Sequence, residues 1–242
     1  KGDRFAVGFE HCIEVTSKKD TILQALSLIP VYGAVAILIW KLSWHPLQFL
    51  SPAISKILLT AIFILYIFNV LQSVRSNLPK TYERASAEKK YEFKQILILS
   101  LVYALTFGSQ LAVISMFPQF LETAFDLSVA TAGMLGSSFA VMNLLTRPAG
   151  GWISDRIEKK SSLILFVTGS MIGYAAMSQI TSSWSLWSVL LLALGCSIFL
   201  QAGTGACFAA VPLIRKDLTG QMAGMAGAYG SIGAVVFLTV FS

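Results

Sequence analysis

Arg147 is an ionisable residue within a stretch of the chain that is otherwise almost entirely apolar. Residues 127–146 before it contain no Asp, Glu, Lys or Arg, and the next charged residue, Asp155, follows eight positions later. A charged side chain in the hydrocarbon of a membrane is costly, so its presence there is by default a functional hypothesis. The planar guanidinium has five donors, which suit carboxylate, phosphate or another planar oxyanion. We therefore expect Arg147 to bind a small anion; the alternative is a structural arginine bonded to backbone carbonyls.

The position of Arg147 along its helix places it near the middle of a membrane. If Asp155 marks the cytoplasmic edge, eight residues at about 1.5 Å each put Arg147 about 12 Å inside, and half of a hydrocarbon core is about 15 Å. Asn143 precedes Arg147 by four residues and shares its helix face. It is a candidate to orient the guanidinium or bind the same ligand, or else to bond a neighbouring helix. Pro148 should loosen the helix near this point.

Two aromatic residues form a second candidate group. Tyr103 and Phe107 are four positions apart in another apolar stretch, so they share a helix face. Such a pair usually packs in a core. Beside a buried arginine it could instead wall a ligand, with the tyrosine hydroxyl as a polar contact.

A glycine-rich stretch near residue 230 is the third candidate. Gly224, Gly227, Gly230 and Gly233 recur every third residue. Because glycine is costly in a helix, this density needs a reason. Close approach of another helix is one reading, and backbone exposed to a permeating ligand is the other.

Hydropathy indicates how these residues are positioned. The chain of 242 residues is 55% hydrophobic and only 12% charged, and long charge-free stretches separate its charges. Stretches of about 18 apolar residues or more predict membrane-spanning helices. We therefore expect an all-α membrane protein rather than a soluble enzyme, a nucleic-acid binder or a disulfide-stapled domain. The seven predicted spans are 21–43, 51–74, 94–118, 127–154, 161–181, 185–211 and 219–242.

The distribution of basic residues predicts which loops are cytoplasmic. Fifteen of the 18 Lys and Arg residues lie in one alternate set of loops, whereas the opposite set has only Lys41 and Lys56, together with Glu122 and Asp126 in the predicted loop 119–126. The positive-inside rule makes the first set cytoplasmic. It includes the linker 75–94, which reads as a connector between two halves or as a plain solvated loop.

Other chemistries find no support in the sequence. Neither His11 nor His45 falls clearly in a span, and no predicted span contains Asp or Glu, which argues against an intramembrane Ser–His or aspartyl enzyme. No metal-ligand spacing and no phosphate-binding loop are present, so we expect no metal, no cofactor and no enzyme activity. The three cysteines, of which Cys196 and Cys207 lie within spans, are expected to be small apolar packing residues.

The segment 147–160, RPAGGWISDRIEKK, resembles the cytoplasmic loop signature of the major facilitator superfamily, G-x-x-x-D-R-x-G-R-K. The matching residues are Gly151, Asp155, Arg156, Lys159 and Lys160. Glu158 departs from the usual glycine. The resemblance implies that the span 127–154 is helix 8 of an expected twelve, and that Asp155 and Arg156 form a gate latch to the adjoining helix. It also implies three parts: the last helices of an N-terminal bundle (1–74), a cytoplasmic inter-bundle linker (75–94) and an incomplete C-terminal bundle (95–242).

Three strings resemble the nitrate/nitrite porter branch of this superfamily: YALTFGSQLAVISM (103–116), MNLLTRPAGGWISD (142–155) and GQMAGMAGAYGSIGAVVF (220–237). The resemblance implies that Arg147 is one of two arginines that bind the anion, with Tyr103 and Phe107 beside it. It also places Gly227, Gly230 and Ser231 in a nitrate signature, where many members have Asn in place of Ser231.

From this resemblance we expect part of a longer protein: a monomeric secondary transporter of nitrate and nitrite, working by alternating access in the lipid bilayer of the cytoplasmic membrane. A permease for a carboxylate or another small anion is the alternative within the same fold. A non-transporting membrane receptor is the alternative from a different class.

Overall fold

The computed structural model describes residues 15, 18–44, 48–77, 91–181 and 183–241, and the regular structure within them is helical. His11, His45, Cys12 and most of the linker 75–94 lie outside the described residues. The helices are α1 (Lys18–Ser43), α2 (Pro52–Asn77), α3 (Phe93–Tyr103), the π-helix η3 (Ala104–Gly108), α4 (Ser109–Phe125), α5 (Val129–Val141), α6 (Asn143–Arg156), α7 (Lys159–Met177), α8 (Leu186–Ile214), the 3-10 helix η4 (Lys216–Leu218) and α9 (Thr219–Phe241).

These helices confirm the seven predicted spans. Within the described residues, seven helical segments are long and apolar enough to cross a membrane, with α3, η3 and α4 forming one of them and α5 and α6 another. Large apolar side chains point outward along several of these helices, as on α2, where Phe63 and Phe68 are well exposed. A lipid environment accounts for such surfaces, which water would not favour.

One predicted boundary is wrong. The span expected to end at residue 118 continues as α4 to Phe125, so Glu122 lies in a helix rather than in the loop 119–126. Pro118 is accommodated inside α4, and Leu121 beyond it is completely buried in a cluster with Phe117 and Phe139. Burial of this last turn of α4 therefore outweighs the hydrogen bond that the proline cannot donate.

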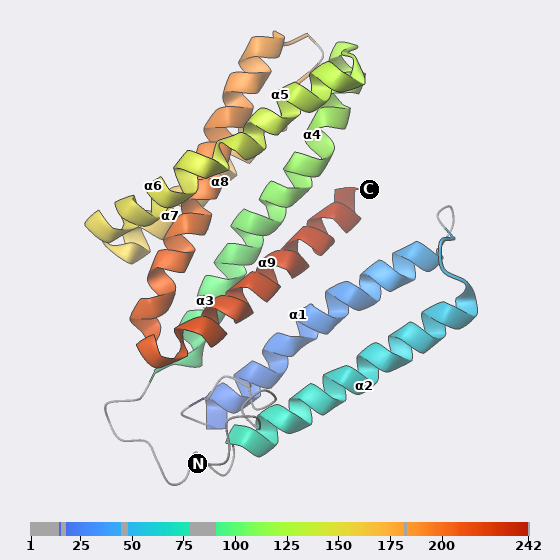
Figure 1. Cartoon of the computed structure of the whole chain (residues 1–242), viewed down its shortest axis with the longest axis vertical. Coiled ribbons are helices and arrows are strands. Elements are labelled where there is room, and N and C mark those ends of the chain that lie inside the picture. Colours follow the sequence, from blue (N-terminus) through green and yellow to red (C-terminus); the bar gives the residue numbers. More distant parts are fainter. Residues whose placement is uncertain (1–14, 16–17, 45–47, 78–90, 182, 242) are drawn as a thin grey trace, which may run out of the picture.

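The helices pack in two groups around α9. α1 and α2 lie side by side as one pair, and α9 runs between this pair and the helix formed by α3, η3 and α4 (Figure 1). On the other side, α8 packs against both α6 and α7. Hydrogen bonds from Tyr229 to the Ser27 carbonyl and from Lys41 Nζ to the Thr239 carbonyl (2.5 Å) join α1 to α9.

Two of the membrane-spanning helices are interrupted near their middles. The first changes to π-helical geometry over Ala104–Gly108, and the second is broken at Met142 between α5 and α6. The break lies six residues before Pro148, whose ring and missing N–H act on the carbonyl of Leu144, two residues after the break. Both interruptions lie at or next to candidate site residues: the first includes Phe107 and follows Tyr103, and the second precedes Asn143.

Glycines allow the helices to approach closely at these interruptions. A side chain at Gly108 would lie 2.5 Å from the backbone of Gly233 on α9, and one at Gly150 on α6 would overlap the backbone of Ala202 on α8. By contrast, a side chain at Gly133 on α5 would meet no atom within 4 Å. Gly150 is therefore required by packing, whereas Gly133 is not.

We expect Gly150→Ala to lower the free energy of unfolding by about 1–3 kcal/mol, because the added methyl forces α6 and α8 apart. The matched control, Gly133→Ala, should leave it unchanged or raise it by up to ~1 kcal/mol. Reversible unfolding of the detergent-solubilised protein measures both. Equal effects of the two substitutions would contradict the close contact.

Candidate substrate-binding site

Arg147 is half-buried on α6 and faces a hollow of about 730 Å³. This Arg147 hollow is lined by residues of α5, α6 and α8: Ala140, Val141, Asn143, Leu144, Arg147, Pro148, Gly151, Gly205 and Phe208. Apart from Arg147 and Asn143, the lining side chains are apolar or absent. Such a cavity, with a few polar groups converging on it, is typical of a small-molecule site.

The guanidinium is held by a hydroxyl and three aromatic rings. Arg147 Nη2 donates to the hydroxyl of Tyr103 at 2.8 Å. The guanidinium carbon lies 6.0, 5.8 and 5.4 Å from the ring centres of Tyr103, Phe107 and Phe208, respectively. Cation–π attraction of this kind is worth about 0.5–2 kcal/mol per contact, more where water is excluded. The acceptor is a neutral hydroxyl, so the positive charge of Arg147 is supported without being neutralised.

The aromatic rings form one rigid unit. Tyr103 and Phe107 stack with centres 5.1 Å apart and an interplanar angle of 11°, which confirms that they share a face. Phe208 from α8 meets the Tyr103 ring edge-on at 4.9 Å. Tyr103 is 97% buried, and neither it nor Phe107 lines the hollow. The pair therefore lies behind the guanidinium and fixes its direction, and the ring at the hollow is Phe208.

Two glycines bring the neighbouring helices against this unit. A side chain at Gly230 on α9 would lie 2.5 Å from the Tyr103 ring and 2.9 Å from that of Phe107. A side chain at Gly205 on α8 would overlap the backbone carbonyl oxygen of Arg147 itself. Both positions need glycine because a ring or a backbone occupies the space of a side chain.

Asn143 joins Arg147 at the hollow, as their spacing predicts. Its Oδ1 atom is buried and has no hydrogen-bond partner. A buried carbonyl oxygen without a donor is costly, so Oδ1 has unused capacity to accept a hydrogen bond one turn from the guanidinium. An anion, which also only accepts, would be bound through the Nδ2 amide group instead.

The structure does not bring every predicted site residue to the hollow. Gly227 has no neighbour within 4 Å of where a side chain would be, and Ser231 is exposed, its hydroxyl donating to the Gly227 carbonyl at 3.3 Å. Neither residue lines the Arg147 hollow.

The residues of the predicted loop motif follow Arg147 along α6. Gly151 lines the hollow. At the end of the helix, Asp155 pairs with Lys159, the first residue of α7, and Arg156 stacks on Trp152 at 5.0 Å. The motif thus joins α6 to α7 at the end of the helix.

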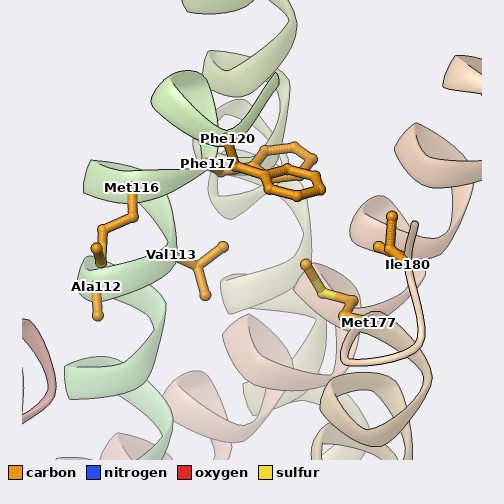
Figure 2. A pocket seen from close by; sticks show the side chains of 7 residues that line it. All are labelled: Ala112, Val113, Met116, Phe117, Phe120, Met177 and Ile180. Carbon is orange, nitrogen blue, oxygen red and sulfur yellow. The ribbon is translucent and has the colours of Figure 1, made fainter. Parts of the chain in front are cut away.

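Two other cavities differ in character from the Arg147 hollow. Figure 2 shows a pocket lined by apolar side chains of α4, the last residue of α7 and the segment that follows it: Ala112, Val113, Met116, Phe117, Phe120, Met177 and Ile180. Its volume is about 230 Å³. The other cavity lies between α1, α2 and α9 and is lined by uncharged polar and apolar residues, including Gln24, Ser73 and Gln221. Neither contains a charged side chain, so the Arg147 hollow is the best suited of the three to an anion.

The residues that α8 contributes to the hollow were not predicted from the sequence. Phe208 and Gly205 line the hollow from α8, yet they lie in a stretch with no charge and no aromatic pair to draw attention to it. The sequence QAGTGACF (201–208), with two glycines and two alanines before an aromatic, was the available signal. No group of three His, Cys, Asp or Glu side chains in the described parts of the chain could hold a metal ion.

Comparison with known proteins identifies the family. The model of the Major Facilitator Superfamily matches residues 25–238. The chain belongs to the major facilitator superfamily. No solved structure matches the chain.

Several transporters of this kind are similar in sequence. The chain is 41% identical to the nitrate/nitrite transporter NrtP of a Picosynechococcus strain, over 94% of this chain and 43% of that protein. It is 34% identical to NrtP of Nostoc punctiforme, over 95% of this chain and 47% of that protein. A probable nitrate/nitrite transporter NarK2 of Mycobacterium tuberculosis is 31% identical over 56% of this chain and 34% of its own length. The chain thus spans less than half the length of these relatives.

A double-mutant cycle tests the bond between Tyr103 and Arg147. Tyr103→Phe keeps the aromatic stack and removes only the hydroxyl, and Arg147→Met removes the guanidinium. We expect a coupling energy of about 1.5–3 kcal/mol in the free energy of unfolding, the range for hydrogen bonds to charged groups. Strictly additive effects would show that the two groups are not bonded.

Proposed function

We propose that the protein is a transporter of nitrate and nitrite, and that Arg147 binds the anion from the hollow beside it. The observation that carries this proposal is a guanidinium that faces a cavity while its acceptor within the protein is the neutral hydroxyl of Tyr103. The similarity to proteins named as nitrate/nitrite transporters supports the same substrate.

The proposed binding mode follows from the shape of the guanidinium. One of its five donors is used by Tyr103, and the others lie in the same plane. A flat oxyanion can accept two parallel N–H bonds from such a fork, which a lysine ammonium cannot offer. Asn143 would donate its amide to a further oxygen, and Phe208 would limit the thickness of the ligand.

For the whole protein we propose alternating access, in which two helical bundles move around this site. Residues 1–74 would belong to one bundle and 95–242 to the other, with 75–94 as a cytoplasmic linker. We further propose a monomer in the cytoplasmic membrane, with no enzyme activity, and a role for Gly227, Gly230 and Ser231 along the path of the anion. For Gly230 the support is indirect, because its close contact with Tyr103 and Phe107 lets these rings pack behind Arg147.

We expect Arg147→Lys to lower nitrate uptake at limiting concentration by about 10–100-fold, because a lysine keeps the charge but loses the fork. Arg75→Lys, at an exposed position near the end of α2, is the matched control and should transport normally. Uptake into proteoliposomes is the measurement. Normal uptake by Arg147→Lys would contradict planar recognition.

The same assay separates the alternatives. Nitrite should compete with nitrate and a dicarboxylate should not. Uptake of the dicarboxylate in place of nitrate would instead identify a carboxylate permease, and no uptake of any anion would favour a receptor.

The pair formed by Asp155 and Lys159 suggests a gating role, since it joins α6 to α7 about 12 Å from Arg147. We expect Asp155→Asn to lower the maximal uptake rate by up to about fivefold, in line with the small energy of an exposed ion pair, and to leave KM unchanged. Glu158→Gln is the control, because that exposed carboxylate accepts from Ser161 one turn later in the chain. A change in KM alone would contradict a gating role.

A further inference from the structure

The break between α5 and α6 leaves polar backbone groups that need partners from outside the helix. α5 ends at Val141 and α6 begins at Asn143. Met142 between them keeps helical backbone angles and its bonds to Ser138 and Thr146, so the helical pattern is interrupted in the bonds beside it rather than at its own groups. Carbonyls at the end of a helix have no donor within it, and in an apolar environment a carbonyl without a donor is expensive. The carbonyl of Phe139 lies in this last turn of α5.

Two buried side chains of α8 supply the donors. Gln201 Nε2 donates to the Phe139 carbonyl at 2.7 Å, and the hydroxyl of Ser197 donates to the same oxygen at 2.9 Å. Gln201 Nε2 also donates to Ser197 Oγ at 2.7 Å. Both side chains have no exposed surface, so these bonds replace helical ones in a dry environment.

The other end of the Gln201 amide reaches the far side of the break. Thr146 donates its hydroxyl to Gln201 Oε1 at 2.6 Å, and Thr146 is the residue directly before Arg147. One glutamine therefore bonds α5 through its nitrogen and α6 through its oxygen. A helix with a break in its hydrogen-bond pattern can bend there, and Gln201 bonds to both sides of this break.

A single face of α8 controls both the position and the direction of the Arg147 turn. Ser197, Gln201 and Gly205 are spaced by four residues and so lie one above another on α8. They contact, in order, the Phe139 carbonyl, Thr146 and the backbone carbonyl of Arg147. Phe208 follows Gly205 by three residues, about one helical turn further along α8, and its ring approaches the Arg147 guanidinium.

We propose that Gln201 is a positioning residue for anion binding: it clamps the broken helix so that Arg147 points into the hollow. This inference rests on the proposed function for the identity of the anion, but the clamp itself is a property of α5, α6 and α8. Displacements of about 1 Å can cost a binding or reacting group a large part of its effect, which is why a residue that does not line the hollow should matter.

The test uses Gln201→Met, which has nearly the same volume and no hydrogen-bonding amide. The matched control is Gln110→Met on α4, a glutamine that is 98% buried and whose Oε1 has no partner. Two quantities are measured: hydrogen–deuterium exchange of the backbone amides of residues 139–147, and the KM and maximal rate of nitrate uptake into proteoliposomes.

For Gln201→Met we expect exchange in residues 139–147 to be about tenfold faster and the KM for nitrate to rise about tenfold or more, with the maximal rate per inserted molecule little changed. Thr146→Val removes the bond from the Arg147 turn to Gln201, together with the bond from the same hydroxyl to the Met142 carbonyl, and leaves the bonds of Gln201 to α5 in place. It should raise KM in the same direction by a smaller factor. It also replaces Gln201→Met as the test should that variant fail to insert. Gln110→Met should match the parent protein in both measurements.

Each other outcome has a defined meaning. Unchanged exchange in Gln201→Met and Thr146→Val would overturn the clamp, and faster exchange with an unchanged KM would overturn its role in positioning Arg147. A parent protein that takes up no nitrate would overturn the proposed function instead, and the exchange data would still decide whether Gln201 holds the break.

Discussion

The central constraint in this structure is a guanidinium placed among apolar helices. A charge in such a place must be supported, and the usual support is a carboxylate. Here Arg147 has a neutral hydroxyl as its hydrogen-bond acceptor and three aromatic rings within 6.0 Å. These contacts hold the side chain while leaving its positive charge in place. A site built this way keeps its electrostatic attraction for an anion, whereas a carboxylate paired with Arg147 would have neutralised the charge.

The helices around Arg147 are shaped by the same requirement. To bring a hydroxyl, an amide and aromatic rings to one point, the backbone departs from regular α-helix at Ala104–Gly108 and at Met142. π-helical turns and helix breaks of this kind are frequent at functional sites. Such departures free backbone groups, and beside Met142 the Gln201 amide donates to the Phe139 carbonyl. Gly205 and Gly233 let the neighbouring helices pack closely against the backbone of Arg147 and Ala104. Contacts from neighbouring helices thus stabilise the π-helical turn and the helix break.

The Arg147 hollow differs from the apolar pocket of the same structure in what it offers a charged ligand. A small anion needs a site with positive charge and hydrogen-bond donors, because an apolar pocket such as that in Figure 2 has no polar side chain to replace the water that hydrates the ion. The Arg147 hollow provides one guanidinium, the side-chain amide of Asn143 and a single ring. This donor set matches a flat, singly charged oxyanion better than a bulky one.

The sequence by itself determined the seven spans, because crossing a membrane demands long apolar stretches and expels charge from them. It also determined the pairing of Asn143 with Arg147 and of Tyr103 with Phe107, since residues four apart share a helix face whatever the helix packs against. Only the tertiary structure decided that Tyr103 supports Arg147 from behind, that Phe208 forms the wall, and that Gln201 crosses the break. Those contacts join residues 44, 61 and 62 positions apart, and their formation depends on how closely the helices approach. That approach is set by the detailed packing of glycines against rings and backbone, which hydropathy and spacing along one chain do not encode.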